Sequence, residues 1–442
     1  MLTARVFWTL RERGAGALLR RLRESQFWSR ERIRQYQLDK LLQLLRHAYA
    51  QVPFYERALQ SCGARPEDIR SLEDFQRLPV LTKELIRENF DDLVARSAKQ
   101  EDRLPNATGG STGEPLQLLQ DRQYQHWADA ARMRGWYDMA GCRPGDRCAV
   151  LWGDVRDVKE DFSLGERIRG ILVSGEVVLN SFNLSADRKR TFLRWCRWFR
   201  PKLLRGYVTA IKDFAEFLED QRLSFPPLKG IILCAETVDA DSQSMIERVF
   251  GAPSFNMYGG REVSLTAMEC EAKCGLHEVS ENNYVEFEPI DLPGHPGAGN
   301  LLVTNLNNCV MPLIRYRIGD IGVPSDRQSC RCGRGLPLIA KVIGRTTDVF
   351  EFHDGTRIAG EMFIHLMKEF PIRAYQFVQV SERQMVLRLT RADAQNEELR
   401  TSIRDAYRPY LPQGVMIEFE EVDRFERTPT GKFRFVYRQV PA

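Results

Sequence analysis

The segment Thr108–Pro115 combines small residues with hydroxyl side chains. Positions 108–113 hold three glycines, one serine and two threonines. Glycines let several backbone N–H groups turn toward one point, and hydroxyls add further donors, a combination that binds phosphate oxygens. The Gly-Lys-Ser/Thr ending of a Walker loop is missing. The segment therefore predicts a phosphate-binding loop, with a Gly/Ser turn that holds no ligand as the alternative.

Three further turns carry side chains of the kinds that bind a nucleotide. Tyr258–Glu262 (Tyr-Gly-Gly-Arg-Glu) places an aromatic ring and a carboxylate around a Gly-Gly turn. Tyr316–Asp320 ends on a carboxylate suited to ribose hydroxyls, and Thr428–Lys432 presents a lysine on a Pro/Gly turn. Each segment alone is typical of an ordinary turn. Their order and character together favour binding of a nucleotide.

Four of the ten cysteines form two tight pairs, Cys270 with Cys274 and Cys330 with Cys332, and His277 follows the first pair. This spacing is typical of a metal site and not of a disulfide framework. Tetrahedral zinc takes four Cys or His ligands, so five candidates compete for four positions. Free thiols on Gly-rich loops are the alternative. The other cysteines are scattered singly, as in proteins of a reducing compartment.

With these motifs in this order, the sequence resembles the adenylate-forming superfamily of acyl-coenzyme A synthetases, peptide-synthetase adenylation domains and luciferases. It is similar in particular to the phenylacetate–coenzyme A ligase-like branch, which includes proteins associated with capsule biosynthesis. The likeness runs nearly the whole chain. Besides the glycine loop and the tail, it includes His-Ala-Tyr at 47–49, Val-Pro-Phe-Tyr at 52–55, and Leu-Pro with Leu-Thr-Lys at 78–83.

The resemblance implies a role for each motif. The residues implied to hold the ATP phosphates are Thr108, Gly109, Gly110, Ser111, Thr112 and Gly113. Those implied to line the adenine are Ala235, Glu236, Tyr258 and Gly259. Glu262 is implied to hold Mg²⁺, Asp320 the ribose hydroxyls, and Arg345 the ribose or a phosphate. Lys432 is implied to contact the α-phosphate and the substrate carboxylate, which makes Lys432, Glu262 and Thr112 the implied catalytic residues.

On the pattern of the same ligase branch, zinc is expected on Cys270, His277, Cys330 and Cys332, with Cys274 as the alternative to Cys270. The ion would be structural, a staple beside the nucleotide site. At the expected hinge this chain has Thr347, followed by Asp348, which leaves its domain rotation open.

The implied reaction is ATP-dependent activation of a small carboxylic acid as an acyl-adenylate, with release of pyrophosphate, followed by acyl transfer to an acceptor. Coenzyme A is the default acceptor, and an amine, a hydroxyl or a carrier thiol in surface polysaccharide or secondary metabolite synthesis is the alternative. An inactive zinc-stapled scaffold is the non-enzyme alternative. The acid is not identified by the sequence. Candidate walls of its pocket, with core packing as the alternative, are Trp136, Tyr137, Trp152 and Cys234.

The elements that must position these motifs indicate an α/β fold. Apolar runs at 148–152, 230–234 and 301–305 alternate with amphipathic segments at 191–199 and 211–218, a pattern typical of a largely parallel sheet. After about residue 343 the pattern becomes helix, strand, helix, strand. We expect a large N-terminal multi-subdomain α/β domain with parallel-type sheets at 1–344. A small C-terminal α+β lid domain at 345–442 would carry Lys432.

The charge balance limits the partners. With 64 Lys and Arg against 60 Asp and Glu, the net charge is +4, too small for the strongly basic footprint of a nucleic-acid-binding protein. No apolar run of about 18 residues predicts a membrane span. The Arg-rich first 25 residues lack a signal-peptide core and predict a solvated helix on the domain, with a membrane-surface or partner helix as the alternative. We expect a cytoplasmic protein, and the oligomeric state is left open.

Overall fold

The computed structural model describes residues 15–108, 116–143, 145–152, 165, 175–181, 184–345, 349–367, 369–372, 374–427 and 433–439. The chain forms two compact units. The first unit contains residues 1–286, 301–318 and 324–341, and the second contains 287–300, 319–323 and 342–442. Our boundary at 344/345 between two functional domains stays a prediction.

The main sheet of the described residues has the strand order β10-β11-β12-β13-β9-β8-β7-β6-β5-β3-β4. The strands that run parallel to one another are β4 (Glu176–Asn180), β3 (Cys148–Trp152), β5 (Leu203–Tyr207), β6 (Gly230–Cys234) and β7 (Ser254–Gly260). The antiparallel pairs that follow join β7 to β8 (Ser264–Glu269), β8 to β9 (Leu276–Glu278) and β9 to β13 (Leu338–Arg345). The expected α/β class is confirmed, and the sheet is mixed because it contains both parallel and antiparallel pairs.

Three strands complete the sheet, namely β10 (Asn283–Pro289), β11 (Gly299–Asn305) and β12 (Tyr316–Pro324). The division between the units runs within β10, β11, β12 and β13, so each of these strands contributes residues to both.

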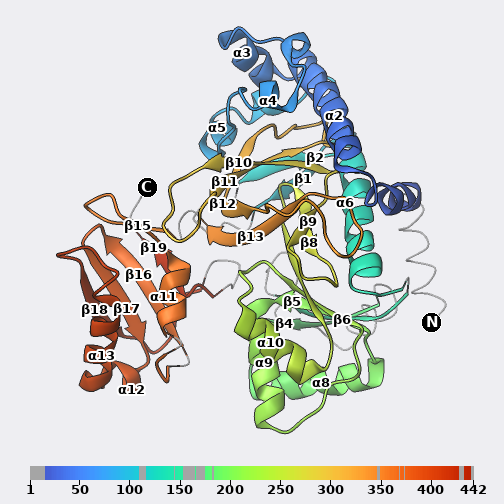
Figure 1. Ribbon diagram of the computed structural model, residues 1–442. Coiled ribbons are helices and arrows are strands. Elements are labelled where there is room, and N and C mark those ends of the chain that lie inside the picture. The colour runs from blue at the N-terminus through green and yellow to red at the C-terminus, as the bar shows by residue number, and fades with distance from the viewer. Residues whose placement is uncertain are drawn as a thin grey trace. The chain divides into compact units, whose positions relative to one another are not determined.

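Helices cover both faces of the parallel strands. On one face, α8 (Ala186–Phe199), α9 (Val208–Asp220) and α10 (Ala240–Phe250) pack against Leu151, Leu204 and Leu233 (Figure 1). On the other face, helix 15–25, α6 (Arg122–Arg134) and the π-helix η4 (Gly135–Met139) pack against Val150 and Ile232. Successive strand residues point to opposite faces, so strands buried on both sides need continuous apolar runs. The run Gly230–Cys234 is buried at every position for this reason.

The N-terminal segment is part of this core. In helix 15–25, Leu19 and Leu22 are buried among the residues of α6 and η4. Because they are buried in the protein, these apolar side chains are not available for the membrane-surface contact considered as the alternative. Residues 1–14 lie outside the described residues. The helix α2 (Arg30–Gln51) starts at Ser29, whose hydroxyl accepts the N–H of Arg32. Among the described helices, none combines the length and the apolar character that a bilayer crossing requires.

The remaining elements of the first unit are short. They are α3 (Pro53–Ser61), α4 (Leu72–Phe75), α5 (Lys83–Glu88), the 3₁₀ turns η1 (Pro66–Asp68), η2 (Asp91–Leu93) and η3 (Gln100–Asp102), and the hairpin strands β1 (Leu104–Ala107) and β2 (Gln117–Gln120).

The second unit contains a four-stranded sheet in the order β18-β17-β16-β19. Its strands are β16 (Tyr375–Ser381), β17 (Gln384–Leu389), β18 (Met416–Glu421) and β19 (Val436–Arg438). The hairpin β14 (Val349–Glu351) and β15 (Arg357–Ala359) and the helices α11 (Gly360–Met367), α12 (Arg391–Ala394) and α13 (Glu397–Tyr407) complete it. Its core is aromatic, with Phe363 stacked on Tyr407 at 5.3 Å between ring centroids. The expected small α+β domain at the C-terminus is confirmed.

Candidate active site and metal centre

The glycine loop connects the two strands of a β-hairpin. The strands β1 and β2 pair antiparallel from Leu104–Gln120 to Ala107–Gln117. Beyond them the Thr108 N–H donates to the Leu116 carbonyl at 3.0 Å, and the Leu116 N–H donates to the Thr108 hydroxyl at 2.9 Å. The Thr108 side chain thus closes the loop in addition to any phosphate contact. Outside the described residues lie Gly109, Gly110, Ser111, Thr112 and Gly113.

In the Tyr258–Glu262 motif, the first three residues end β7, and Arg261 and Glu262 lie in the turn before β8. The register shifts between Tyr258 and Gly259, so the strands carry an irregularity at this point. A Cβ at Gly259 would collide with the carbonyl oxygen of Ser264, which explains a glycine here. The carboxylate of Glu262 is buried and accepts a long hydrogen bond from the Tyr316 hydroxyl at 3.5 Å. A buried carboxylate is a fitting ligand for Mg²⁺, which prefers oxygen.

The main-chain carbonyl of Arg261 joins these two motifs. It accepts hydrogen bonds from the Gln120 amide at 2.7 Å, from the Asn106 amide at 3.2 Å and from the Tyr124 hydroxyl at 3.3 Å. Burial and the nearby Glu262 carboxylate raise the pKa of Tyr124 well above its ordinary value, so the hydroxyl remains a donor. Hydrogen bonds therefore connect the hairpin that flanks the glycine loop to the Tyr258–Glu262 motif.

The segment after β6 has an unusual backbone. Ala235 has φ of 67°, in the left-handed region that residues with a side chain rarely adopt. The next residue, Glu236, accepts the Thr209 N–H at 2.7 Å and its hydroxyl at 3.0 Å. Its carboxylate therefore sits at the N-terminus of α9, where the helix dipole favours a negative charge. This turn follows the carboxyl end of a parallel strand, the edge where open α/β sheets bind ligands.

Two predicted nucleotide residues meet in the second unit. The guanidinium of Arg345 pairs with the Asp320 carboxylate, with 3.0 Å between Nε and Oδ1. Asp320 follows Gly319, whose φ is 89°, and is itself only 8% exposed. Lys432 and the hinge position Thr347 lie outside the described residues.

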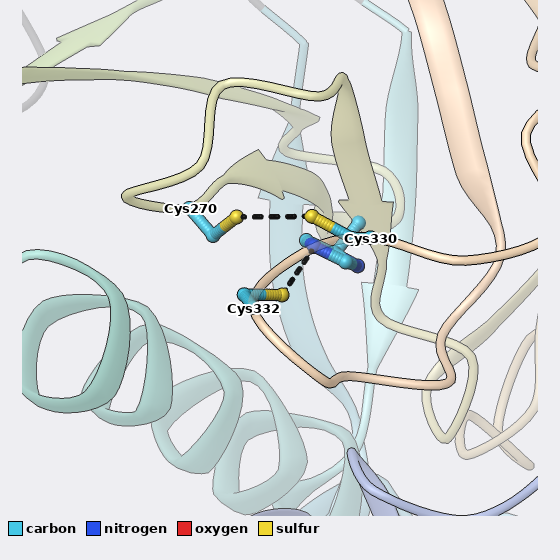
Figure 2. A group of neighbouring side chains, drawn as sticks. Cys270, Cys330 and Cys332 are labelled. Atoms are coloured by element: carbon cyan, nitrogen blue, oxygen red, sulfur yellow. Dashed lines mark hydrogen bonds between the residues drawn. The ribbon is translucent and has the colours of Figure 1, made fainter.

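Cys270, His277, Cys330 and Cys332 converge on one point. One potential ligand atom from each lies within 4.8 Å of all the others. The Cys270 and Cys330 sulfurs are 3.6 Å apart, and the Cys332 sulfur is 3.3 Å from the His277 Nε2 (Figure 2). A disulfide would hold its sulfurs at about 2.05 Å. Tetrahedral zinc with Zn–S of about 2.3 Å would hold them roughly 3.8 Å apart, so the donor set fits zinc.

The surroundings of this cluster suit a metal ligand set. Burial and the Arg334 guanidinium lower the pKa of His277 to about 4, so the imidazole is neutral near pH 7 and its nitrogen can ligate. Cys270 follows β8, His277 lies in β9, and the Cys330–Cys332 turn precedes β13. Leu338 of β13 is the register partner of His277, so backbone pairing brings the two sequence segments together. Cys274 packs beside the cluster without belonging to it.

The sequence is similar to a known family model and to known proteins. Residues 350–439 match the CapK C-terminal domain. A phenylacetate–coenzyme A ligase of Pseudomonas putida is 27% identical over 330 residues, which cover 72% of this chain and 71% of that protein. Protein CapK of Staphylococcus aureus is 23% identical over 401 residues, 88% of this chain and 85% of that one.

A solved structure matches almost the entire fold. 2-Hydroxyisobutyryl-CoA ligase in the postadenylation state, in complex with R3-HIB-AMP, aligns with a TM-score of 0.72 at 20% identity, covering 94% of this chain and 91% of that one. The chain is similar in sequence to phenylacetate–coenzyme A ligases and shares the fold of 2-hydroxyisobutyryl-CoA ligase. The resemblance drawn from the motifs is confirmed, and the roles of individual residues stay predictions.

Two of the residues expected to line the acyl pocket, Trp136 and Trp152, contact a residue that the sequence analysis missed. Arg205 of β5 lies between the rings of Trp136 and Trp152, 5.8 and 5.7 Å from their centroids. It also pairs with Glu176 of β4 at 3.1 Å. A charged residue inside the run Leu203–Tyr207 was the available signal. Tyr137, a residue of η4, is buried in the core against which Trp136 and Trp152 also pack.

Proposed function

We propose that this chain is an ATP-dependent carboxylate-activating ligase that forms an acyl-adenylate and passes the acyl group to a thiol, with coenzyme A as the acceptor. The carrying observation is the similarity to a phenylacetate–coenzyme A ligase over 72% of the chain. The hydrogen bonds at the Arg261 carbonyl support it, because they join the hairpin that flanks the glycine loop to the motif that contains Tyr258 and Glu262.

The chemistry runs in two balanced steps. A carboxylate oxygen of the acid attacks the α-phosphorus of ATP, and pyrophosphate leaves with the electron pair of the broken P–O bond. The acceptor thiolate then attacks the acyl carbonyl, and AMP leaves. The protein needs little covalent chemistry, so positioning and charge neutralisation dominate. In this proposal Glu262 would hold Mg²⁺ and Asp320 the ribose. Arg345 would hold the ribose or a phosphate, and Lys432 would neutralise the charge that develops at phosphorus.

The domain assignment belongs to the same proposal. Residues 1–344 would supply the ATP and acyl sites, and residues 345–442 would act as the lid that brings Lys432 to the reacting atoms. Zinc on the Cys270–Cys332 cluster would have a structural role, because four protein ligands leave no open position for a substrate.

A coupled test covers both steps. Pyrophosphate release is measured with purified protein, ATP and Mg²⁺ over a panel of aryl, branched and hydroxylated carboxylic acids, and acyl-coenzyme A is then sought by mass spectrometry. We expect acid-dependent pyrophosphate release with at least one acid, and a thioester when coenzyme A is present. Release of pyrophosphate with amide or ester formation only would move the acceptor to an amine or hydroxyl. No ATP-dependent turnover with any acid would favour the inactive scaffold.

A further inference from the structure

The helix α8 carries a concentration of positive charge on the first unit. Residues 186–202 contain seven basic side chains against one acidic side chain, Asp187, which gives a formal charge of +6. The whole chain carries only +4. Positive charge is therefore concentrated in α8 and the turn after it, and the other residues together carry a small net negative charge.

Three arginines and one tryptophan form the exposed face of α8, which we call the α8 patch: Arg190, Arg194, Arg197 and Trp198. Residues at these spacings share one side of a helix. The opposite side holds Phe192, Leu193, Cys196 and Phe199, all buried in the core of the first unit. Because that side is fixed in the protein, the axis of α8 lies along the surface and the patch faces outward.

The charge of the patch is mostly uncompensated by its immediate contacts. Arg194 donates to the hydroxyl of Thr191 at 3.0 Å, and Arg197 donates to the carbonyl of Ser224 at 3.2 Å. Both partners are neutral oxygens, which orient the guanidiniums and leave their charge in place. Arg190 has a carboxylate partner, Asp187, at 3.4 Å, an exposed pair of little energetic weight.

Lys189, by contrast, is buried and paired with Asp213 at 2.7 Å, so it belongs to the fold and not to the patch.

Trp198 gives the patch an apolar contact. Its side chain is 67% exposed, and its ring meets that of Trp195 edge to face at 5.9 Å. An exposed indole beside arginines combines an apolar ring with positive charge, which suits a contact with a surface that is both apolar and anionic. Indole rings prefer the boundary between hydrocarbon and polar headgroups, where one edge is apolar and the N–H remains hydrated.

We propose that the α8 patch binds the first unit reversibly to an anionic phospholipid surface. The guanidiniums would contact headgroup phosphates, and Trp198 would enter the interfacial layer. The apolar face of α8 is already buried in the protein, so the helix does not insert, and the attraction is mainly electrostatic. The proposal therefore assigns the membrane contact, considered above for the N-terminal helix, to α8, whose basic face is exposed. The inference does not depend on the catalytic function.

Flotation with lipid vesicles tests the proposal on the full chain. At low salt we expect binding to vesicles of equal parts phosphatidylglycerol and phosphatidylcholine, and little binding to phosphatidylcholine alone. Raising the salt to about 0.5 M should release the protein, because screening shortens the range of the attraction. The variant R190Q/R194Q/R197Q should lower the partition coefficient at least about tenfold, since each basic side chain near an anionic surface contributes several-fold.

Matched variants separate the patch from total charge. R65Q/R70Q/R77Q removes three exposed arginines elsewhere in the first unit and should keep wild-type binding within about twofold. The variant R190K/R194K/R197K keeps the charge and should also bind. Trp198→Ala should bind several-fold more weakly, and it provides a second test if the triple glutamine variant does not fold. Circular dichroism melting checks the fold of each.

Three results would overturn the proposal. One is equal binding of the wild type to anionic and neutral vesicles. Another is equal loss of binding in R190Q/R194Q/R197Q and R65Q/R70Q/R77Q. The third is binding to soluble polyglutamate without binding to anionic vesicles, which would assign the patch to an acidic protein partner instead.

Discussion

The side-chain amide of Gln120 donates a 2.7 Å hydrogen bond to the main-chain carbonyl of Arg261. The two residues are 141 positions apart: Gln120 lies in the hairpin that flanks the glycine loop, and Arg261 lies in the Tyr258–Glu262 motif. Asn106, on the other strand of the hairpin, donates both to that carbonyl and to the Gln120 side-chain oxygen. Protein hydrogen bonds therefore join the hairpin β1–β2 to the turn that follows β7.

Gln120→Leu removes this joint at nearly constant volume. We expect a loss of about 1–2 kcal/mol in the free energy of unfolding, because the Asn106 amide and the Arg261 carbonyl each lose a buried partner. We also expect pyrophosphate release to fall roughly tenfold, since small misplacements of binding groups cost rate steeply. Urea unfolding and the pyrophosphate assay measure the two effects.

Gln117→Leu is the matched control. Gln117 lies on the same strand, β2, with its side chain exposed, so its replacement should change stability by less than about 0.5 kcal/mol and leave activity intact. If Gln120→Leu behaves like Gln117→Leu in both assays, the joint does not position the loop.

Removal of one cysteine from the cluster should remove zinc. We expect about one equivalent of zinc in the native protein by elemental analysis, and loss of most of it in Cys330→Ser. Because metal-binding energy is part of the folding energy, the variant should also unfold at lower temperature. Less than about a tenth of an equivalent in the native protein would contradict a zinc site.

Two further serine variants sharpen this test. Cys62→Ser changes an exposed thiol far along the chain from the cluster and should keep the zinc. Cys274→Ser should also keep it, because Cys274 packs beside the four converging side chains without belonging to them. If Cys270→Ser retains zinc and Cys274→Ser loses it, the fourth zinc ligand is Cys274 and not Cys270.

Local pattern was enough to find the strands whose environment is uniform. β6 (Gly230–Cys234) is apolar throughout and was predicted with the same ends, because burial on both faces demands it. β16 (Tyr375–Ser381) was missed, since Gln376 and Gln379 interrupt its apolar pattern. Both glutamines are fully buried and donate to main-chain carbonyls, Gln376 to Glu426 and Arg434, Gln379 to Glu351. Those partners come from tertiary structure, which periodicity does not reveal.

In the candidate site, too, some features could be predicted from the sequence and others depend on tertiary structure. Its motifs are short, so residue type and spacing indicate them one at a time. Their connection through the Arg261 carbonyl depends on hydrogen bonds between residues far apart in the sequence. The placement of Arg205 between Trp136 and Trp152 likewise requires β5 to lie beside β3. Sequence pattern predicts which residues take part, and strand order decides which of them meet.

Asp320→Asn tests the ribose contact. Hydrogen bonds to a charged group contribute about 1.5–3 kcal/mol, so loss of the carboxylate charge should lower kcat/KM for ATP by roughly 10- to 100-fold, mainly through KM. The change also leaves Arg345 without its ion-pair partner at 3.0 Å. Steady-state kinetics with varied ATP measures the effect. Asp326→Asn, at an exposed position of the following loop, should leave KM for ATP unchanged. Equal KM values in the two variants would remove Asp320 from the ribose site.

Lys432→Ala tests the lid. A lysine that acts only on the charge developing at the α-phosphorus contributes to the transition state more than to ATP binding. We therefore expect pyrophosphate release to fall by about 100-fold or more, while the Kd for ATP, measured by calorimetry, changes less than about threefold. Lys99→Ala, which removes an exposed lysine from the first unit, should match the wild type. Acid-dependent pyrophosphate release at the wild-type rate in Lys432→Ala would show that this lysine does not serve adenylation, whatever the remaining motifs bind.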